Sequence, residues 1–498
     1  MTGTAQVIVV GAGPAGLMLA AELRLGGVDV TVLEAAPHPA GQSRAPGVYA
    51  RTIEVWRQRG ILDRFPDKRF GRMSHFALLP VALDLSTPGT EDAVLLMPQA
   101  RMEQVLAEWA ESLGARILRS RTVKGLAQDE HGVTVTARRA DGTAEHLRTD
   151  YLVGCDGGRS SVRRLCGFDF PGTPATTEVL LADMAGLPAD LPVLKGRPFP
   201  HHRSEHGWLA MSVVTLSDDR PGLVRIIAGE FDRPPARRPE PPAFDEVCHV
   251  VKNISGLDIS SAEPVWLSSF GNGTRQVTEY RRGRVLLAGD AAHVHPPFGG
   301  QGLNLGIQDA VNLGWKLAAE VTGRAPQGLL DTYHAERQPV AARVLLNTRA
   351  QDALMRGGPE VESLRTVVTE LLRTPEANRR MSDELSAVAV HYPLGEGELV
   401  GRRVPPVELR LAEGTSANTL DLLHDARGVL LDLGADLAHH AAPWAGRVHQ
   451  VRATGAFPGQ AALLIRPDGH VAWSTPHREP AGLAEALHRW FGEPGTDR

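Results

Sequence analysis

The sequence contains only three cysteines in 498 residues, Cys155, Cys166 and Cys248. They form neither a CxxC pair nor a zinc-type cluster, and their odd number does not suggest a disulfide framework. A reducing, cytoplasmic compartment therefore fits the sequence best, and no metal site is expected. Because no cysteine follows Cys248, dithiol redox chemistry is excluded from the C-terminal half of the chain.

An excess of charge of one sign is also lacking. The formal net charge is −5, from 53 basic and 58 acidic residues, and there is no polybasic run. Neither nucleic acid nor a membrane surface is therefore an expected partner. The apolar stretch from Val7 to Leu23 is interrupted by three glycines and a proline, and no positive charge precedes it. We interpret it as a buried strand leading into a helix, not as a signal sequence or a membrane span.

The chain is long enough for two or three domains, and its first segment has the pattern of a βαβ unit. A β-branched run at 6–10 is followed by a glycine-rich turn, a helical pattern from Pro14 to about Leu25, and a second strand pattern at 28–34. Further strands are predicted at 151–153 and 284–288. Residues 133–138 are expected to form one arm of a hairpin, because Asp-Gly follows them.

The turn of the βαβ unit has the motif GxGxxG, and Glu34 ends the second strand. In such a turn the first glycine permits the tight bend, and the second lets the backbone approach a pyrophosphate. The third glycine lets helix and strand pack closely. The positive end of the helix would face the pyrophosphate, and Glu34 would accept hydrogen bonds from the adenosine ribose. The sequence therefore predicts a dinucleotide site formed by Gly11, Gly13, Pro14, Ala15, Gly16 and Glu34.

Two further motifs favour FAD over NAD. Asp156 follows one predicted strand and Asp290 follows another. Asp290 could hold a hydroxyl of the ribityl chain, which FAD has and NAD lacks. A glycine-rich loop from 296 to 304 follows Asp290 and leads into an amphipathic helix. The positive end of that helix would point at the flavin pyrimidine edge, where negative charge builds on reduction.

In this order and at these separations, the three motifs resemble those of class A FAD-dependent aromatic hydroxylases, the para-hydroxybenzoate hydroxylase fold group. Stretches such as 43–44, 50–55, 167–172 and 271–281 are most similar to the hydroxylases of aromatic polyketide (angucycline-type) biosynthesis in actinomycetes. The resemblance covers nearly the whole chain. It implies a bound FAD, NADPH as a transient co-substrate, O2, and a polycyclic phenol or quinone as the small-molecule substrate. It also implies a place in antibiotic or other secondary-metabolite biosynthesis.

The predicted fold class is α/β: a Rossmann-type FAD-binding domain, an inserted antiparallel-sheet substrate domain and a C-terminal domain that the resemblance implies is thioredoxin-like. Between about 169 and 270 the helical period fades, and alternating pieces such as 223–230 predict an antiparallel sheet. The expected FAD-binding domain comprises 1–70, 95–168 and 271–393; the substrate domain comprises 71–94 and 169–270; the thioredoxin-like domain comprises 394–498.

The resemblance also implies individual cofactor contacts. Arg44 would contact the adenosine–pyrophosphate part of FAD, Gln99 would lie near the ribityl chain, and the Val123 backbone near the adenine. Asp156 and Arg159 would belong to an element with a double role in FAD and nicotinamide binding. The remaining cofactor residues would be Asp290, Pro297, Gly300, Gly302, Leu303 and Asn304, and the active-site loop would contain Pro297, Gly299, Gly300 and Gln301.

The implied mechanism needs no protein nucleophile. Only one glycine fingerprint is present, so the nicotinamide would bind transiently, reduce the flavin and leave. O2 would then form a C4a-hydroperoxide, whose distal oxygen an electron-rich phenol carbon attacks. No general base is assigned; His293 and His295 could polarise a substrate hydroxyl or be structural.

Two alternatives and the oligomeric state stay open. A Baeyer–Villiger enzyme acting on a ketone would need the same flavin residues. A non-catalytic FAD-binding protein is the alternative from another class. A homodimer is one option for the assembly.

Overall fold

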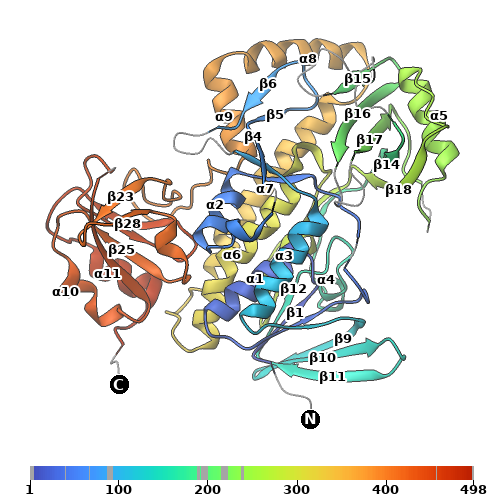
Figure 1. Cartoon of the computed structure of the whole chain (residues 1–498). Coiled ribbons are helices and arrows are strands. Elements are labelled where there is room, and N and C mark those ends of the chain that lie inside the picture. The colour runs from blue at the N-terminus through green and yellow to red at the C-terminus, as the bar shows by residue number, and fades with distance from the viewer. Residues whose placement is uncertain are drawn as a thin grey trace.

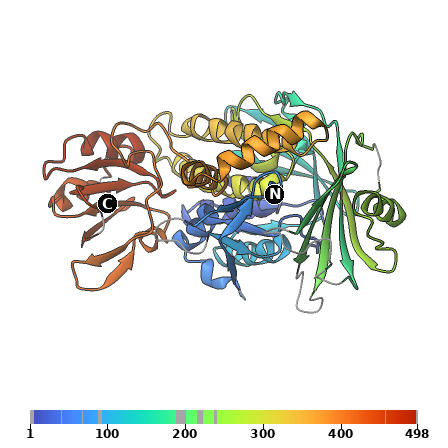
Figure 2. The ribbon, with the colours of Figure 1, turned by 90° about the horizontal axis from the view of Figure 1, so that it is seen from above.

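The computed structural model describes residues 5–39, 41–66, 68–86, 93–187, 191, 200–214, 222–236, 240–455 and 457–495. A central α/β part lies between a five-stranded antiparallel sheet at one end and a β-rich C-terminal part at the other (Figures 1 and 2). The mixed α/β fold predicted from the sequence is confirmed.

The central sheet has the order β20-β21-β12-β1-β2-β8, and all its strands except β20 run parallel. Its central strands β1, β2 and β12 are buried at every position, as in a parallel sheet covered on both faces. The strands are β1 (Val7–Val10), β2 (Val30–Leu33), β8 (Arg116–Leu118), β12 (Tyr151–Gly154), β20 (Arg281–Arg282) and β21 (Val285–Leu287).

Helix α1 (Pro14–Leu25) packs between α3 (Gln99–Ser112) and α6 (Gln301–Val321) beside this sheet. A three-stranded sheet lies below it in Figure 1, formed by β9 (Arg121–Asp129), β10 (Gly132–Arg139) and β11 (Ala144–Thr149). The pairing of β10 with β11 confirms the hairpin predicted at 133–138.

The five-stranded sheet has the order β15-β16-β17-β14-β18 and is antiparallel throughout. Its strands are β14 (Glu178–Ala185), β15 (His201–Arg203), β16 (Gly207–Val214), β17 (Leu223–Glu230) and β18 (Glu263–Gly271). Helix α5 (Phe244–Ser255) covers one face through Val247, Val250, Val251 and Ile254. The expectation that helical character fades in this region is therefore wrong for 244–255. An i, i+3, i+4, i+7 pattern and a left-handed Gly256 mark the helix locally.

The other face of this sheet points toward the central part. Val179, Trp208, Ile227 and Phe270 pack in one apolar cluster with Phe298, which follows the central sheet. Helices α7 (Thr332–Leu354), α8 (Pro359–Leu372) and α9 (Pro375–Leu385) contribute to the same cluster, as do residues in 76–85 and 93–94. The sheet and the helices after α6 thus share a core.

The C-terminal part contains a six-stranded sheet of order β24-β23-β26-β25-β27-β28 and the helix α11 (Leu483–Phe491). Its strands are β23 (Glu408–Leu411), β24 (Ser416–Asn418), β25 (Gly428–Asp432), β26 (Val448–Thr454), β27 (Ala462–Ile465) and β28 (Val471–Thr475). Two apolar clusters lie on its two faces, and one of them includes Trp315 of α6. This part is therefore packed directly against the central part.

The shorter elements complete the chain. They are α2 (Ala50–Gln58), α4 (Ser161–Leu165), α10 (Ala438–Ala441), β3 (Gly47–Tyr49), β4 (Arg69–Gly71), β5 (Met73–His75), β6 (Ala82–Asp84), β7 (Val94–Leu96), β13 (Gly172–Thr173), β19 (Thr274–Gln276) and β22 (His293–Val294).

Candidate functional site

The three motifs singled out in the sequence meet at one edge of the central sheet. Val10, Gly154 and Leu287 end the adjacent parallel strands β1, β12 and β21 in register. The glycine turn, Asp156 and Asp290 follow these strand ends directly, and Glu34 follows β2. Ligands of open α/β sheets bind outside the carboxyl ends of the strands, so this edge is the candidate site.

The glycine turn has the geometry that a pyrophosphate requires. A Cβ on Gly16 would lie 2.0 Å from the carbonyl oxygen of Gly11, so only glycine allows this close packing of helix and turn. A Cβ on Gly13 would meet no atom within 4 Å. Gly13 caps α1, Pro14 begins the helix, and Ala15 packs near Gly289. The space beside Gly13 thus lies open at a helix N-terminus, where an anionic group is stabilised.

The carboxylate of Glu34 is held at the rim of this space. Its Oε2 accepts a hydrogen bond from Ala12 N (2.8 Å) and its Oε1 from Ala36 N (2.8 Å). Both bonds come from backbone groups, so the orientation of the carboxylate is fixed before any ligand binds. A ribose hydroxyl at this rim could donate to the remaining lone pairs.

Asp156 has an internal role that the sequence did not reveal. Its carboxylate accepts hydrogen bonds from Ser160 Oγ (2.5 Å), Ser161 N (2.6 Å) and Val162 N (3.2 Å). It therefore caps α4. Arg159 is exposed, and its carbonyl accepts a hydrogen bond from Arg164.

Asp290 lies beside the beginning of α6. A Cβ on Gly302 would be 4.0 Å from Asp290 Oδ1 and 3.5 Å from His295 Nε2. The N-cap of α6 is Gly300, and no acidic residue occupies the first turn. No acidic side chain in the first turn of this 21-residue helix therefore offsets its positive end. Together with the open space at Gly13, this arrangement fits an FAD.

The loop before α6 is held by Asn304 and Tyr49. Asn304 Oδ1 accepts hydrogen bonds from Tyr49 N (2.9 Å) and Thr52 Oγ1 (2.7 Å), while its Nδ2 donates to Gly300 O (3.0 Å). Tyr49 Oη donates to Gly299 O (2.8 Å). Burial raises the pKa of the Tyr49 phenol, which keeps it a donor. No sequence pattern points to Tyr49, apart from its place next to a stretch that carries the resemblance.

The other loop residues have different environments. Pro297 is exposed, Leu303 is half-buried, and Gln301 is buried with its Nε2 donating to Asn347 Oδ1 (3.2 Å). Gly299 and Gly300 both have left-handed backbone conformations, with φ of 72° and 62°, which non-glycine residues rarely adopt. Gly299 is buried, and a Cβ there would lie 2.9 Å from both Gln351 Nε2 and Leu385 Cδ2, whereas Gly300 is partly exposed.

Gln99 is bonded to the segment that carries Arg44. Gln99 Oε1 accepts a hydrogen bond from Ala45 N (3.3 Å), and Arg44 is exposed. A residue that sequence reasoning missed, the buried Arg225 of β17, donates to the carbonyls of Ser43 and Arg44. Its guanidinium pairs with Asp183 of β14 at 2.7 and 2.8 Å. The five-stranded sheet thereby anchors the segment that carries Arg44.

Val123 is buried in β9 opposite Ala137. Two residues before Val123, Arg121 N donates a hydrogen bond to Glu34 O (2.8 Å). The Val123 backbone therefore lies on the Glu34 side of the candidate site.

Of the two histidines left open, His293 belongs to the scaffold. It is fully buried, and its Nε2 lies 2.7 Å from Asp309 Oδ2. Burial alone would raise the pKa of Asp309, but Arg337 and His293 hold it below its usual value. His295 Nδ1 lies 2.9 Å from Pro296 O, and burial lowers the pKa of its imidazole. His295 therefore remains uncharged near neutral pH.

Among the described residues, no group of three or more His, Cys, Asp or Glu side chains is placed to hold a metal ion. Within the same part of the chain, no helix is both long enough and apolar enough to cross a membrane.

Comparison with known proteins identifies the family. The family described as "FAD binding domain" matches residues 4–348, and "Aromatic-ring hydroxylase, C-terminal" matches 397–494. The chain is 45% identical over 509 residues to 12-dehydrotetracycline 5-monooxygenase/anhydrotetracycline 6-monooxygenase of Streptomyces rimosus, covering 98% of this chain and 99% of that protein. It is 41% identical over 488 residues to dialkyldecalin synthase of Streptomyces rugosporus, covering 98% of both.

A solved structure is similar over the full length. It is that of CabE, an aromatic hydroxylase from angucycline biosynthesis, with 47% identity, a TM-score of 0.90, and coverage of 99% of this chain and 100% of that one. The fold and these relatives define an FAD-dependent monooxygenase. The chain belongs to the FAD-binding aromatic-ring hydroxylase family, which confirms the resemblance seen in the sequence.

Proposed function

We propose that this chain hydroxylates a polycyclic aromatic polyketide of the phenol or quinone type, at the expense of NADPH and O2. The reaction would belong to the biosynthesis of an antibiotic or another secondary metabolite. The observation that carries the proposal is the placement of an apolar face of the five-stranded sheet against the glycine-rich loop 296–304. Trp208 of β16 meets Phe298 of the loop edge-on, with ring centroids 6.0 Å apart.

The inner face of the five-stranded sheet suits fused rings. By register, Val179, Leu181 and Asp183 of β14 lie on the same face as Phe270, Ser268 and Trp266 of β18. The charged residue that β14 contributes to this face, Asp183, is paired with Arg225, which neutralises its charge. Strand β18 remains half-buried along 265–271. A mainly apolar face with accessible aromatic side chains favours a flat, multi-ring ligand.

The residues of the site would bind and orient the cofactor. Gly13 and the N-terminus of α1 would hold the pyrophosphate, Glu34 the adenosine ribose, and Asp290 the ribityl chain. Pro297, Gly300, Gly302, Leu303 and Asn304 would present backbone to the ring, with Arg44, Gln99, Val123, Asp156 and Arg159 completing the cofactor site. Bound FAD supplies the redox chemistry, accepting hydride from the nicotinamide and activating O2 once reduced.

The remaining contribution of the protein is to exclude water and orient the substrate. The apolar cluster around Phe298 keeps water from the reacting atoms, which limits loss of reducing equivalents as hydrogen peroxide. Gly300 and Gly302 would keep bulky side chains away from a flavin ring, so that the ring could move between a reducible and a shielded position. A single glycine fingerprint supports transient binding of NADPH without a domain of its own.

The finer domain arrangement is part of the proposal. We assign 1–70, 95–168 and 271–393 to the FAD-binding domain, 71–94 and 169–270 to the substrate domain, and 394–498 to a thioredoxin-like domain. The parallel sheet, the antiparallel sheet and the C-terminal sheet support this division. The core that α8 and α9 share with the antiparallel sheet supports a substrate site built from both of the first two domains.

The test is NADPH oxidation by the FAD-loaded protein, with and without a panel of polycyclic phenols and quinones, under ¹⁸O2. We expect substrate-dependent NADPH oxidation and a product carrying one labelled oxygen as an aromatic hydroxyl. A labelled lactone would instead identify a Baeyer–Villiger reaction. An isomerised product formed without NADPH consumption would refute the monooxygenase proposal in favour of a non-oxidative role for FAD.

A further inference from the structure

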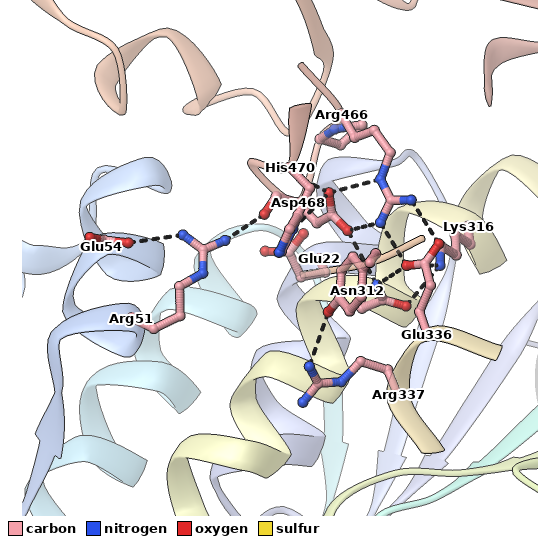
Figure 3. Close-up of polar contacts among 12 residues, drawn as sticks. Glu22, Arg51, Glu54, Asn312, Lys316, Glu336, Arg337, Arg466, Asp468 and His470 are labelled. Carbon is pink, nitrogen blue, oxygen red and sulfur yellow. Dashed lines mark hydrogen bonds and ion pairs between the residues drawn. The ribbon is translucent and has the colours of Figure 1, made fainter. Parts of the chain in front are cut away.

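Two adjacent residues of α7 connect the C-terminal part to the flavin edge of the central sheet. Glu336 accepts a bidentate pair of hydrogen bonds, both 2.7 Å, from Arg466 of the C-terminal part (Figure 3). Arg337 faces the other way and donates from Nε to Asp309 Oδ1 of α6 (2.7 Å). All four side chains are buried. Consecutive residues of α7 thus form ion pairs with the C-terminal part, through Glu336, and with α6, through Arg337.

The contact with the C-terminal part is charge-balanced. Lys316 Nζ donates to Glu336 Oε2 (2.9 Å), and Asp468 accepts from Arg466. Asn312 Nδ2 bridges the two carboxylates, at 2.7 Å from Glu336 Oε2 and 3.2 Å from Asp468 Oδ2. Two cations and two anions therefore compensate each other. Loss of one member would leave a buried charge without a partner, so the junction has one strongly preferred arrangement.

The contact between Arg337 and α6 is connected, through Asp309, to the Gly289–Asp290 turn. Asp309 Oδ2 accepts a hydrogen bond from Gly289 N (3.1 Å) and lies 2.7 Å from His293 Nε2. Gly289 directly precedes Asp290, the residue assigned to the ribityl chain. Arg337 also donates to Leu305 O (3.2 Å), in the first turns of α6, and to the hydroxyl of Tyr392 (3.0 Å). The Arg337 guanidinium thus holds both the Asp309 carboxylate, which accepts from Gly289 N, and the start of α6.

We propose that Arg337 and Arg466 are positioning residues for FAD, through which the C-terminal part sets the geometry of the Gly289–Asp290 turn. Arg466 and Asp468 fix Glu336, and with it the rotation of α7 that aims Arg337 at Asp309. This assigns to a cysteine-free domain a role in cofactor binding. The inference rests on the proposed function only in that FAD is the ligand of the turn.

The experiment is titration of the apoprotein with FAD, followed by flavin fluorescence and the visible spectrum. Arg337→Met should weaken FAD binding about tenfold or more, because a buried, charged hydrogen bond to Asp309 is lost. Arg466→Met, although distant from the FAD site, should weaken FAD binding roughly fivefold. The matched control is Arg343→Met on the same helix, because the Arg343 side chain is the exposed member of its ion pair with Glu384. It should change FAD affinity less than about twofold.

A double-variant cycle separates positioning from general destabilisation. If Arg466 acts through Arg337, the Arg337→Met/Arg466→Met protein should bind FAD clearly better than the product of the two single effects implies. Arg466→Lys, which retains the charge, should recover part of the affinity. Tyr392→Phe removes one hydrogen bond from Arg337 and provides a conservative variant should the Arg466 variants not fold; it should weaken FAD binding by roughly threefold.

The inference is overturned if the folded Arg466→Met or Tyr392→Phe protein binds FAD as tightly as the unaltered chain, whatever its melting temperature. It is also overturned if the effects of Arg337→Met and Arg466→Met simply multiply. Failure of the unaltered chain to bind FAD would instead refute the proposed function. The two failures are therefore distinguishable in one set of titrations.

Discussion

Gly13→Val is the sharpest test of where the pyrophosphate lies. Gly13 has an ordinary extended backbone, with φ of −79° and ψ of 179°, and no atom lies within 4 Å of the position of a Cβ. The protein itself therefore has room for the new side chain. Its only conflict would be with a ligand at the N-terminus of α1.

The magnitudes follow from these two facts. Replacing the N-cap glycine should lower the stability of the apoprotein by only about 1 kcal/mol. A branched side chain that displaces a pyrophosphate from two backbone N–H groups removes two charge-assisted hydrogen bonds, each about 1.5–3 kcal/mol. The FAD dissociation constant should then rise roughly 100-fold or more.

The assay compares melting temperatures of the apoprotein with and without FAD, together with fluorescence titration. The control is Gly446→Val, which also has open space around the new Cβ but lies in the C-terminal part. We expect Gly446→Val to keep the affinity for FAD. If a folded Gly13→Val protein binds FAD within tenfold of the unaltered chain, the pyrophosphate does not pass over Gly13.

Three further outcomes are expected. Gly300→Val should slow flavin reduction more than it weakens FAD binding, because the new Cβ would lie 3.1 Å from Tyr49 Oη, beside the place assigned to the flavin ring. Equal effects on the rate of reduction in stopped flow and on FAD affinity in titration would contradict this prediction. Asp183→Leu should lower stability in urea by about 3 kcal/mol, since it strands the buried Arg225 cation, and adding Arg225→Met should restore most of it. Burial lowers the pKa of His470 to about 4. The unfolded chain therefore binds more protons between pH 6.5 and 4, and stability should fall by up to about 3 kcal/mol as pH falls through that window. His470→Gln should flatten this limb of the unfolding profile.

The sequence by itself determined the local parts of the flavin site. A β-branched run, a GxGxxG turn and a helix form one contiguous unit, so their hydrogen bonds and packing depend on neighbours in the chain. The strand before Asp290 and the helix after Gly300 were predicted for the same reason. Helix 244–255 was missed although its signals are equally local. Helix 244–255 is therefore also determined by its local sequence.

Only the tertiary structure decided what holds these parts in place. Asn304 reaches Tyr49 across 255 positions, and Arg466 reaches Glu336 across 130. Arg225 and Asp183 meet across a strand pairing whose register depends on the whole sheet. Such contacts have no spacing rule, because they arise where elements distant in the chain pack their faces together. The motif thus specifies which ligand group is bound, and the packing of distant elements specifies where the binding groups point.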